Sequence, residues 1–174
     1  MFRKEQQDGY PGDKLYYEWD DYEADIKQVK NFKFDHVVGI YRGSLPMAVH
    51  ISNVFDVPMS IIGFQTRDGK DKEPYMIKAI DHIHRGFPGK KILIVDDIYD
   101  TGKTMAGVIR YLAHYSADRL QGFCLFGKEN KFNISYANEH DGSWIVFPWE
   151  YMEVPLVMPD HVEDFEKLVE DESI

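Results

Sequence analysis

Two adjacent carboxylates form the part of this chain best suited to chemistry. The apolar run 92–95 (ILIV) leads directly into Asp96 and Asp97. Carboxylate oxygens can accept hydrogen bonds from sugar hydroxyls or act through a divalent cation. Because an acidic pair at a buried strand end is costly without a ligand, the pair predicts a diol or cation site.

The turn that follows (DTGKT) has the composition of a phosphate cradle. Gly102 lets the backbone approach a ligand closely. The backbone N–H groups at a helix start can bind a phosphate, and the hydroxyls of Thr101 and Thr104 can donate further hydrogen bonds to it. The plainer alternative is a helix that Asp100 or Thr101 caps. The turn is not a P-loop, because that motif requires glycine where this chain has Asp97, and no G-x-G-x-x-G sequence follows a predicted strand.

Strands that alternate with helices must position these residues. Periodicity and turn residues predict a short edge strand or cover at 16–19, and strands at 35–41, 58–64, 76–80, 91–96, 120–126 and 144–147. Helices are predicted from Asp20 through Val29, at 46–55 and 103–115, and from Asp160 onward. The alternation indicates an α/β fold with a mainly parallel sheet, whose ligands bind at the carboxyl ends of the strands.

Length and charge narrow the class of protein further. The 174 residues suit a single domain, predicted over 16–174 after a flexible lead-in at 1–15. The net charge of −10 disfavours general nucleic-acid binding, which draws on clustered lysine and arginine. Cys124, the single cysteine, cannot form an internal disulfide, and no signal peptide or membrane-spanning run is evident. We therefore expect a cytoplasmic protein that binds neither nucleic acid nor membrane.

The segment 92–104 resembles the signature with which type I phosphoribosyltransferases bind phosphoribosyl pyrophosphate. Residues 39–45 (GIYRGSL) resemble the pyrophosphate loop of that family, although the usual second glycine is Ser44 here. The charged stretch 65–74 falls where the family has a flexible catalytic loop. Residues 144–150 (WIVFPWE) resemble the base-binding hood of the xanthine-guanine enzymes. The resemblance covers roughly residues 16–155 and points to the 6-oxopurine branch.

This resemblance implies a fold and a reaction. The fold would have three layers, with a mainly parallel central sheet flanked by helices and a small hood formed by parts of the N-terminal segment and about residues 128–160. The enzyme would use Mg²⁺ and transfer the 5-phosphoribosyl group from phosphoribosyl pyrophosphate to hypoxanthine, guanine or xanthine. The products would be a nucleoside 5′-monophosphate and pyrophosphate, as in purine salvage, and the chain would form a homodimer or homotetramer.

The family's catalytic roles fall on particular residues. Asp96 and Asp97 would hold the ribose diol and Mg²⁺, and Asp100 would be the general base for the purine imidazole. Arg67 would close with its loop on the pyrophosphate. Lys128 would donate to the exocyclic oxygen of the base, and because lysine only donates, it would disfavour the amino group of adenine.

The remaining roles concern substrate binding. Arg42 and Gly43 would bind the pyrophosphate, Trp144 would stack on the base, and Ile145 would contact its edge. Glu150 occupies a position where relatives carry an acidic residue near the base or the metal. The 5′-phosphate cradle would consist of Asp100, Thr101, Gly102, Lys103 and Thr104.

Two other functions stay open. One is a regulatory protein that keeps the fold and senses nucleotides or binds nucleic acid, against which the net charge and the complete cradle argue. The other is a phosphoribosyltransferase for another base, which the hood segment 144–150 would distinguish.

Overall fold

The chain divides into two compact units. The computed structural model describes residues 3–5, 14–65, 75–80, 87–115, 117–128 and 134–153. The larger unit is Asp20–Gly142, and the smaller unit combines Met1–Trp19 with Ser143–Ile174. None of the described helices is long and apolar enough to cross a membrane.

A six-stranded sheet in the order β5-β4-β3-β6-β7-β8 forms the centre of the larger unit. Neighbouring strands pair in parallel, except that β4 and β5 are antiparallel. The central strands are rich in apolar residues because both faces of such a sheet are buried. The strands are β3 (His36–Tyr41), β4 (Met59–Gln65), β5 (Tyr75–Ile80), β6 (Lys91–Tyr99), β7 (Arg119–Gly127) and β8 (Ile134–Glu139).

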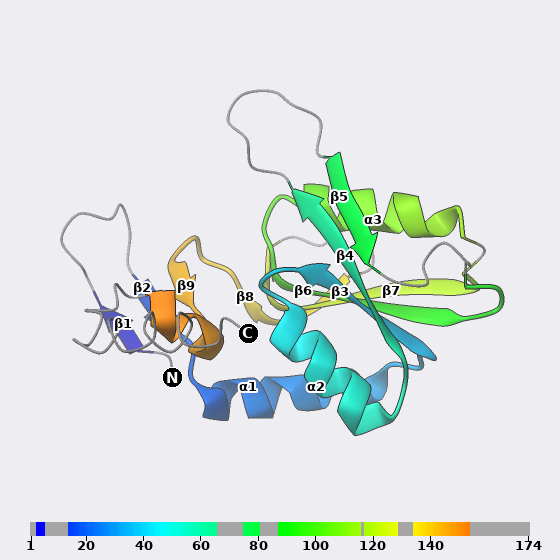
Figure 1. The fold of residues 1–174 in the computed structure, drawn as a ribbon. Helices are drawn as coiled ribbons and strands as arrows, with labels where there is room; N and C mark the ends of the chain where they lie inside the picture. Colours follow the sequence, from blue (N-terminus) through cyan, green and yellow to red (C-terminus); the bar gives the residue numbers. More distant parts are fainter. Residues whose placement is uncertain are drawn as a thin grey trace, which may run out of the picture. The chain divides into compact units, whose positions relative to one another are not determined.

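Helices cover both faces of this sheet, with α3 on one side and α1 and α2 on the other (Figure 1). α1 (Trp19–Ile26) continues into the 3₁₀ helix η1 (Lys27–Asn31). α2 (Leu45–Phe55) has Pro46 in its first turn, where no backbone N–H is needed. α3 (Lys103–Ala113) begins directly after the turn that follows β6. The predicted three-layer α/β fold is therefore confirmed.

Alternate residues of β6 contribute to the core on the α3 side of the sheet. Ile92 and Ile94 are buried in one cluster with Val108 and Leu112 of α3. Because side chains alternate across a strand, Asp96 continues this series on the same face. A carboxyl group thus follows directly on an apolar core.

The smaller unit has a three-stranded sheet in the order β1-β2-β9. β1 (Arg3–Glu5) is antiparallel to β2 (Lys14–Tyr16), and β2 is parallel to β9 (Trp144–Val146), after which the 3₁₀ helix η3 (Pro148–Glu153) follows. Aromatic rings stabilise this unit. Tyr17 meets Phe147 edge-on with ring centroids 5.8 Å apart, and Phe147 stacks on Trp149 at 5.1 Å.

Two features of the main sheet differ from the sequence-based predictions. β6 was predicted to end at residue 96 but runs to Tyr99, because its pairing with β7 continues through Asp96–Cys124 and Tyr99–Gly127. β8 was not predicted, since its sequence (ISYANE) is too polar for a buried strand; it lies at the edge of the sheet.

Other differences concern the ends of the chain. The strand near the predicted edge strand at 16–19 is β2, at Lys14–Tyr16, which shares only Tyr16 with the prediction, and Trp19 begins α1. The predicted lead-in at 1–15 contains β1 and the start of β2. Residues 66–74 of the predicted loop and the helix predicted from Asp160 lie outside the described residues.

A buried histidine links the stability of the main sheet to pH. His36, at the start of β3, is 9% exposed, and its Nε2 lies 2.9 Å from Ser60 Oγ. Burial first, and then the ammonium group of Lys90, lower the pKa of His36. The folded protein therefore keeps this ring neutral at pH values where an unfolded-state histidine, with a pKa of about 6.5, takes up a proton. The buried neutral ring therefore stabilises the folded state above about pH 6.5, and this contribution is lost as the pH falls below that value.

We expect His36 to contribute a decrease in the free energy of unfolding as the pH is lowered from about 7.5 to about 5, and His36→Gln to remove that contribution. Glutamine can still hydrogen-bond Ser60 but does not titrate. Urea unfolding at a series of pH values measures the effect. The matched control is His114→Gln, at an exposed histidine whose Nδ1 lies 2.8 Å from the Arg110 carbonyl oxygen. An identical pH dependence in the wild type and His36→Gln would contradict this assignment.

Candidate active site

The acidic pair lies within β6, and both of its residues are partly buried. Each carboxylate accepts a hydrogen bond from the next backbone N–H, at 3.1 Å from Asp97 N to Asp96 Oδ1 and at 2.7 Å from Ile98 N to Asp97 Oδ1. Burial first, and then the adjacent Asp97 carboxyl, raise the pKa of Asp96 well above its usual range. Hydroxyl donors or a cation at this position would offset both effects.

The donor set of the pair fits a Mg²⁺ ion that is shared with a substrate. Carboxylates are the oxygen ligands that Mg²⁺ takes, and this ion commonly keeps waters and substrate oxygens as well. Within the described residues, no group of three or more histidine, cysteine, aspartate or glutamate side chains could hold a metal ion. Two carboxylates leave room for substrate oxygens, so they suit a Mg²⁺ ion that is shared with a substrate rather than one enclosed by protein ligands.

The loop between β3 and α2 lies against the acidic pair. A Cβ atom added at Gly43 would lie only 1.7 Å from Asp97 Oδ2, so a side chain here would displace that carboxyl. Ser44, in place of the family's second glycine, is fully buried, and its Oγ donates to the carbonyl oxygen of Ile40 at 2.5 Å. The structure therefore brings together Gly43 and Asp97, two residues predicted to bind different parts of one substrate.

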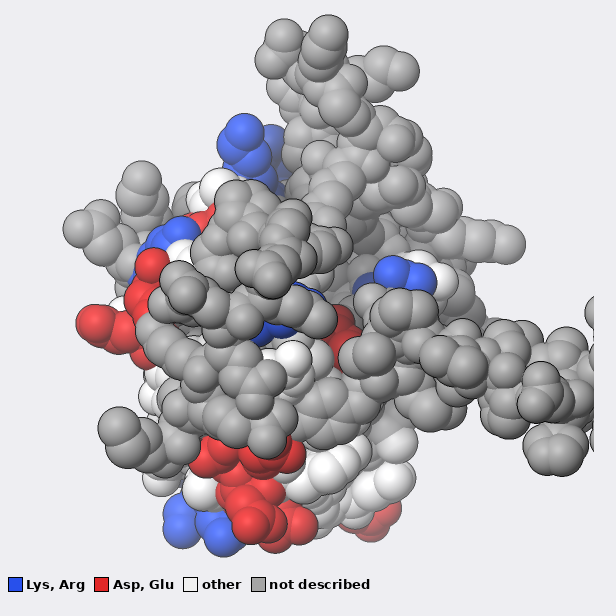
Figure 2. Space-filling model, turned by 90° about the vertical axis from the view of Figure 1, so that its left-hand side faces the viewer, with Lys and Arg blue, Asp and Glu red and all other residues white. Residues whose placement is uncertain are grey.

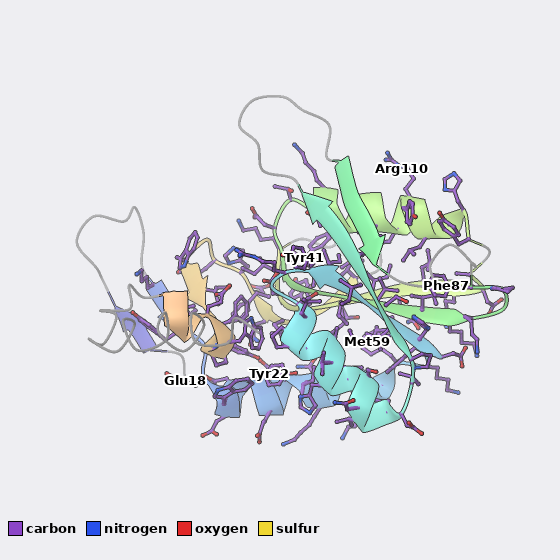
Figure 3. All side chains as sticks on the ribbon, in the orientation of Figure 1. Glu18, Tyr22, Tyr41, Met59, Phe87 and Arg110 are labelled. Carbon is purple, nitrogen blue, oxygen red and sulfur yellow. The ribbon has the colours of Figure 1, made fainter. Side chains whose placement is uncertain are left out.

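The exposed end of that loop carries Arg42, the side chain predicted to bind the pyrophosphate. The peptide bond between Tyr41 and Arg42 is cis, and the Arg42 carbonyl accepts a hydrogen bond from the N–H of Leu45 at 3.1 Å. Tyr41, labelled in Figure 3, is the last residue of β3, and 49% of it is exposed. Arg42, the next residue, is exposed as well.

The predicted phosphate cradle forms the start of α3. Gly102 has φ 73°, and a Cβ atom there would lie 2.5 Å from the hydroxyl oxygen of Tyr99, so both conformation and space favour glycine. The N-cap residue, Gly102, has no side chain to cap the helix, and the N–H of Lys103 donates to Thr101 Oγ1 at 3.5 Å. Thr101 and Lys103 are exposed, and Thr104 is partly buried. The N–H groups at a helix start are suited to bind an anion.

The predicted general base and the predicted base-reading lysine are direct neighbours. Lys128 Nζ lies 2.6 Å from Asp100 Oδ1, and the two side chains are 42% and 53% exposed, respectively. The Lys128 N–H also donates to the Tyr99 carbonyl at 3.0 Å, which extends the ladder of β6 and β7 by one residue. The sequence identifies both residues as candidates but does not predict their contact.

His140 is a candidate site residue that the sequence analysis missed. It follows β8, and its N–H donates to the carbonyl oxygen of Gly127 at 2.8 Å. The alternation of Ile134 and Tyr136 with more polar neighbours was the available signal for a strand ending before His140. Because β8 was not predicted, the residue after it was not considered.

The remaining predicted residues lie elsewhere. Trp144 and Ile145 belong to β9 of the smaller unit, where Trp144 is 50% exposed and Ile145 is 5% exposed. Glu150 Oε2 accepts a hydrogen bond from the N–H of Phe147 at 3.1 Å, so this carboxylate stabilises the turn after β9. Arg67 lies outside the described residues.

The chain is similar to several known proteins. The chain is similar to the transcriptional regulator GfcR of Methanococcus vannielii, at 29% identity over 61% of this chain and 57% of the relative. It is 31% identical to an orotate phosphoribosyltransferase of Sulfurisphaera tokodaii over 50% of this chain and 40% of the relative. The chain thus spans about half the length of the curated relatives it matches.

Solved structures give a wider match. A purine phosphoribosyltransferase from Pyrococcus horikoshii Ot3 has a TM-score of 0.67 and 29% identity, covering 79% of this chain and 93% of the other. A xanthine-guanine-hypoxanthine phosphoribosyltransferase from Helicobacter pylori, at 21% identity, covers 90% of this chain and 99% of its own with a TM-score of 0.66, and shows the shared fold alone. A family model, the phosphoribosyl transferase domain, matches residues 12–155. Since this range is most of the chain, the protein belongs to the phosphoribosyltransferase family.

Proposed function

We propose that this protein transfers the 5-phosphoribosyl group of phosphoribosyl pyrophosphate to a 6-oxopurine base. The observation that carries the proposal is the contact of Asp100 Oδ1 with Lys128 Nζ at 2.6 Å, beside the phosphate cradle. The pair offers a hydrogen-bond acceptor next to a donor. A 6-oxopurine has the complementary edge, with an imidazole N–H beside the carbonyl oxygen at carbon 6.

The reaction exchanges one bond at C1′ of the ribose for another. The bond from C1′ to the pyrophosphate oxygen breaks, the bond from C1′ to a purine nitrogen forms, and the imidazole proton of the base passes to Asp100. Positive charge develops on the ribose in an oxocarbenium-like transition state. Catalysis then depends on positioning, on stabilising the departing pyrophosphate and on the proton acceptor.

Phosphoribosyl pyrophosphate would bind along the carboxyl edge of the sheet. The turn from Asp100 to Thr104 would hold the 5′-phosphate, and Asp96 and Asp97 would accept hydrogen bonds from the ribose hydroxyls. Arg42 and the backbone at Gly43 would bind the pyrophosphate, and Arg67 keeps its predicted role of closing over it. Mg²⁺, when held by the acidic pair, would neutralise negative charge on the pyrophosphate.

The base would be recognised by Lys128, Asp100 and the hood. The similarity to the P. horikoshii purine phosphoribosyltransferase supports a purine as the acceptor. Stacking on Trp144 and an edge contact with Ile145 follow from the family resemblance and remain predictions. So do the purine-salvage role, the cytoplasmic location and a homodimeric or homotetrameric state.

A regulatory function is the second candidate, because the chain is 29% identical to GfcR of M. vannielii. A regulator that binds nucleic acid needs a basic face. On the face drawn in Figure 2, the described lysine and arginine side chains stand in separate small groups among acidic and uncharged ones. The net charge of −10 favours the enzyme.

A panel of bases with phosphoribosyl pyrophosphate and Mg²⁺ tests the two candidates. Hypoxanthine, guanine, xanthine, adenine, orotate and uracil are offered separately, and nucleotide formation is followed by chromatography. Nucleotide formed from a 6-oxopurine supports the enzyme. Product from orotate or uracil alone would assign another base, and no product from any base would overturn the enzymatic proposal.

The acidic pair should determine the affinity for phosphoribosyl pyrophosphate. We expect Asp96→Asn/Asp97→Asn to weaken its Mg²⁺-dependent binding at least about tenfold, or ~1.4 kcal/mol, measured by calorimetry. Asp118→Asn, an exposed residue just before β7, is the control for the loss of a negative charge. Unchanged affinity in the double variant would refute the role of the pair.

Asp100 should matter for turnover more than for binding. Asp100→Asn keeps the size of the side chain but removes the proton acceptor, so we expect kcat to fall ~10²–10⁴-fold while substrate affinity changes little. Single-turnover kinetics at saturating substrate separate the two quantities. If kcat stayed within about threefold of the wild type, Asp100 would only shape the loop.

Lys128 should set the preference for an oxo group at carbon 6. We expect the wild type to use hypoxanthine at least about tenfold better than adenine in kcat/KM, because an adenine amino group leaves the ammonium without its acceptor, a loss of ~1–3 kcal/mol. Lys128→Gln should reduce this preference, since an amide can donate or accept. Lys30→Gln, at an exposed lysine of η1, serves as control. A wild-type preference for adenine would contradict the assignment.

A further inference from the structure

Three neighbouring strand ends place Asp100, Lys128 and His140 in one row. Tyr99, Gly127 and Glu139 are register partners across β6, β7 and β8. The next residue of each strand continues the series, because Lys128 N donates to Tyr99 O at 3.0 Å and His140 N donates to Gly127 O at 2.8 Å. His140 is therefore one strand beyond Lys128, at the usual strand spacing of about 4.8 Å.

The imidazole of His140 is held in a defined orientation. It is partly buried, and Gly142 N–H donates to its Nδ1 at 3.4 Å. A backbone N–H can only donate, so Nδ1 is the acceptor and the proton of the neutral ring is assigned to Nε2. His140 then presents a neutral N–H donor at its outer nitrogen.

Burial and one neighbouring cation favour the neutral form of His140. Burial first, and then the Lys128 ammonium, lower its pKa, while the carboxylates of Asp100 and Asp141 raise it to a lesser degree. These groups come from the ends of β6 and β7 and from the residue next to His140 itself. A neutral imidazole leaves the Asp100–Lys128 pair without a second competing cation.

A base held by this pair would turn a particular side toward His140. With its imidazole N–H at Asp100 and its carbon-6 oxygen at Lys128, the next part of the purine along the row is the side with N1 and carbon 2. N1 carries a hydrogen in every 6-oxopurine, so the substituent at carbon 2 is what distinguishes these bases on this side. A carbonyl oxygen at carbon 2 would accept from an N–H donor there. An amino group at carbon 2 would set donor against donor.

We propose that His140 is a specificity-determining residue that reads the substituent at carbon 2 of the base and favours an oxo group over an amino group. This inference rests on the proposed function and names its substrate more closely: xanthine is used in preference to guanine. His140 acts through the direction of its Nε2–H and takes no part in bond breaking.

The test compares xanthine, guanine and hypoxanthine, which carry an oxo group, an amino group and hydrogen at carbon 2. We expect wild-type kcat/KM to be at least tenfold higher for xanthine than for guanine. In His140→Ala, kcat/KM for xanthine should fall at least tenfold more than kcat/KM for hypoxanthine. In His140→Gln, kcat/KM for xanthine should be retained and kcat/KM for guanine should rise, because the amide offers both a donor and an acceptor. His114→Ala, at the exposed end of α3, should leave all ratios as in the wild type.

Binding of the product nucleotides provides a second readout that needs no turnover. Calorimetry should give tighter binding of xanthosine than of guanosine 5′-monophosphate, with the difference lost in His140→Ala. Equal xanthine-to-guanine ratios in the wild type and His140→Ala, with hypoxanthine still converted, would overturn this inference and leave the proposed function intact. If the wild type converted none of the three bases, both the inference and the proposed function would be overturned.

Discussion

The backbone ladder between β6, β7 and β8 is the interaction on which the candidate site depends. Its hydrogen bonds continue past the apolar part of the strands and include the N–H groups of Lys128 and His140. Parallel pairing brings the carboxyl ends of adjacent strands to one edge at a fixed spacing. Residues separated by tens of positions in the sequence therefore become neighbours, and the Asp100–Lys128 ion pair follows from this alignment.

Close packing around the acidic pair links the site to the rest of the sheet. Asp96 follows the apolar series of β6, and burial raises its pKa. On β7, its register partner Cys124 is fully buried, and burial first, and then the two carboxyls, raise the pKa of this thiol, so it stays protonated and unreactive. Gly43 leaves no space between its loop and Asp97. Carboxyl groups in such surroundings reduce stability, which is typical of residues kept for binding.

The fold by itself does not identify the reaction. Proteins named as a transcriptional regulator, an orotate phosphoribosyltransferase and a purine phosphoribosyltransferase all resemble this chain. Function therefore has to be argued from the site. In this chain, the residues after β6, β7 and β8 supply an acceptor, a cationic donor and a neutral imidazole in sequence along one edge, an arrangement that suits a flat heterocycle with several polar atoms on its rim.

Local patterns in the sequence determined the fold class and the main chemical signature. Apolar runs such as 92–95 predicted the central strands, because a buried parallel strand needs apolar residues on both faces. The proline of α2 and the turn DTGKT predicted where helices begin, since caps and turns depend on a few adjacent residues. These features identified the acidic pair and the cradle as candidates, and the family resemblance added the roles of Asp100 and Lys128, each within its own segment.

Only the tertiary structure decided which of these segments meet. The extension of β6 through Asp96 and Asp97 depends on hydrogen bonds to β7, and the existence of β8 depends on an edge of the sheet that accepts a polar strand. The contacts of Gly43 with Asp97 and of Lys128 with Asp100 join loops from different strands. Periodicity reports how one segment is buried, whereas pairing and close approach depend on partners that are distant in sequence. His140 is a candidate site residue only because β8 pairs with β7.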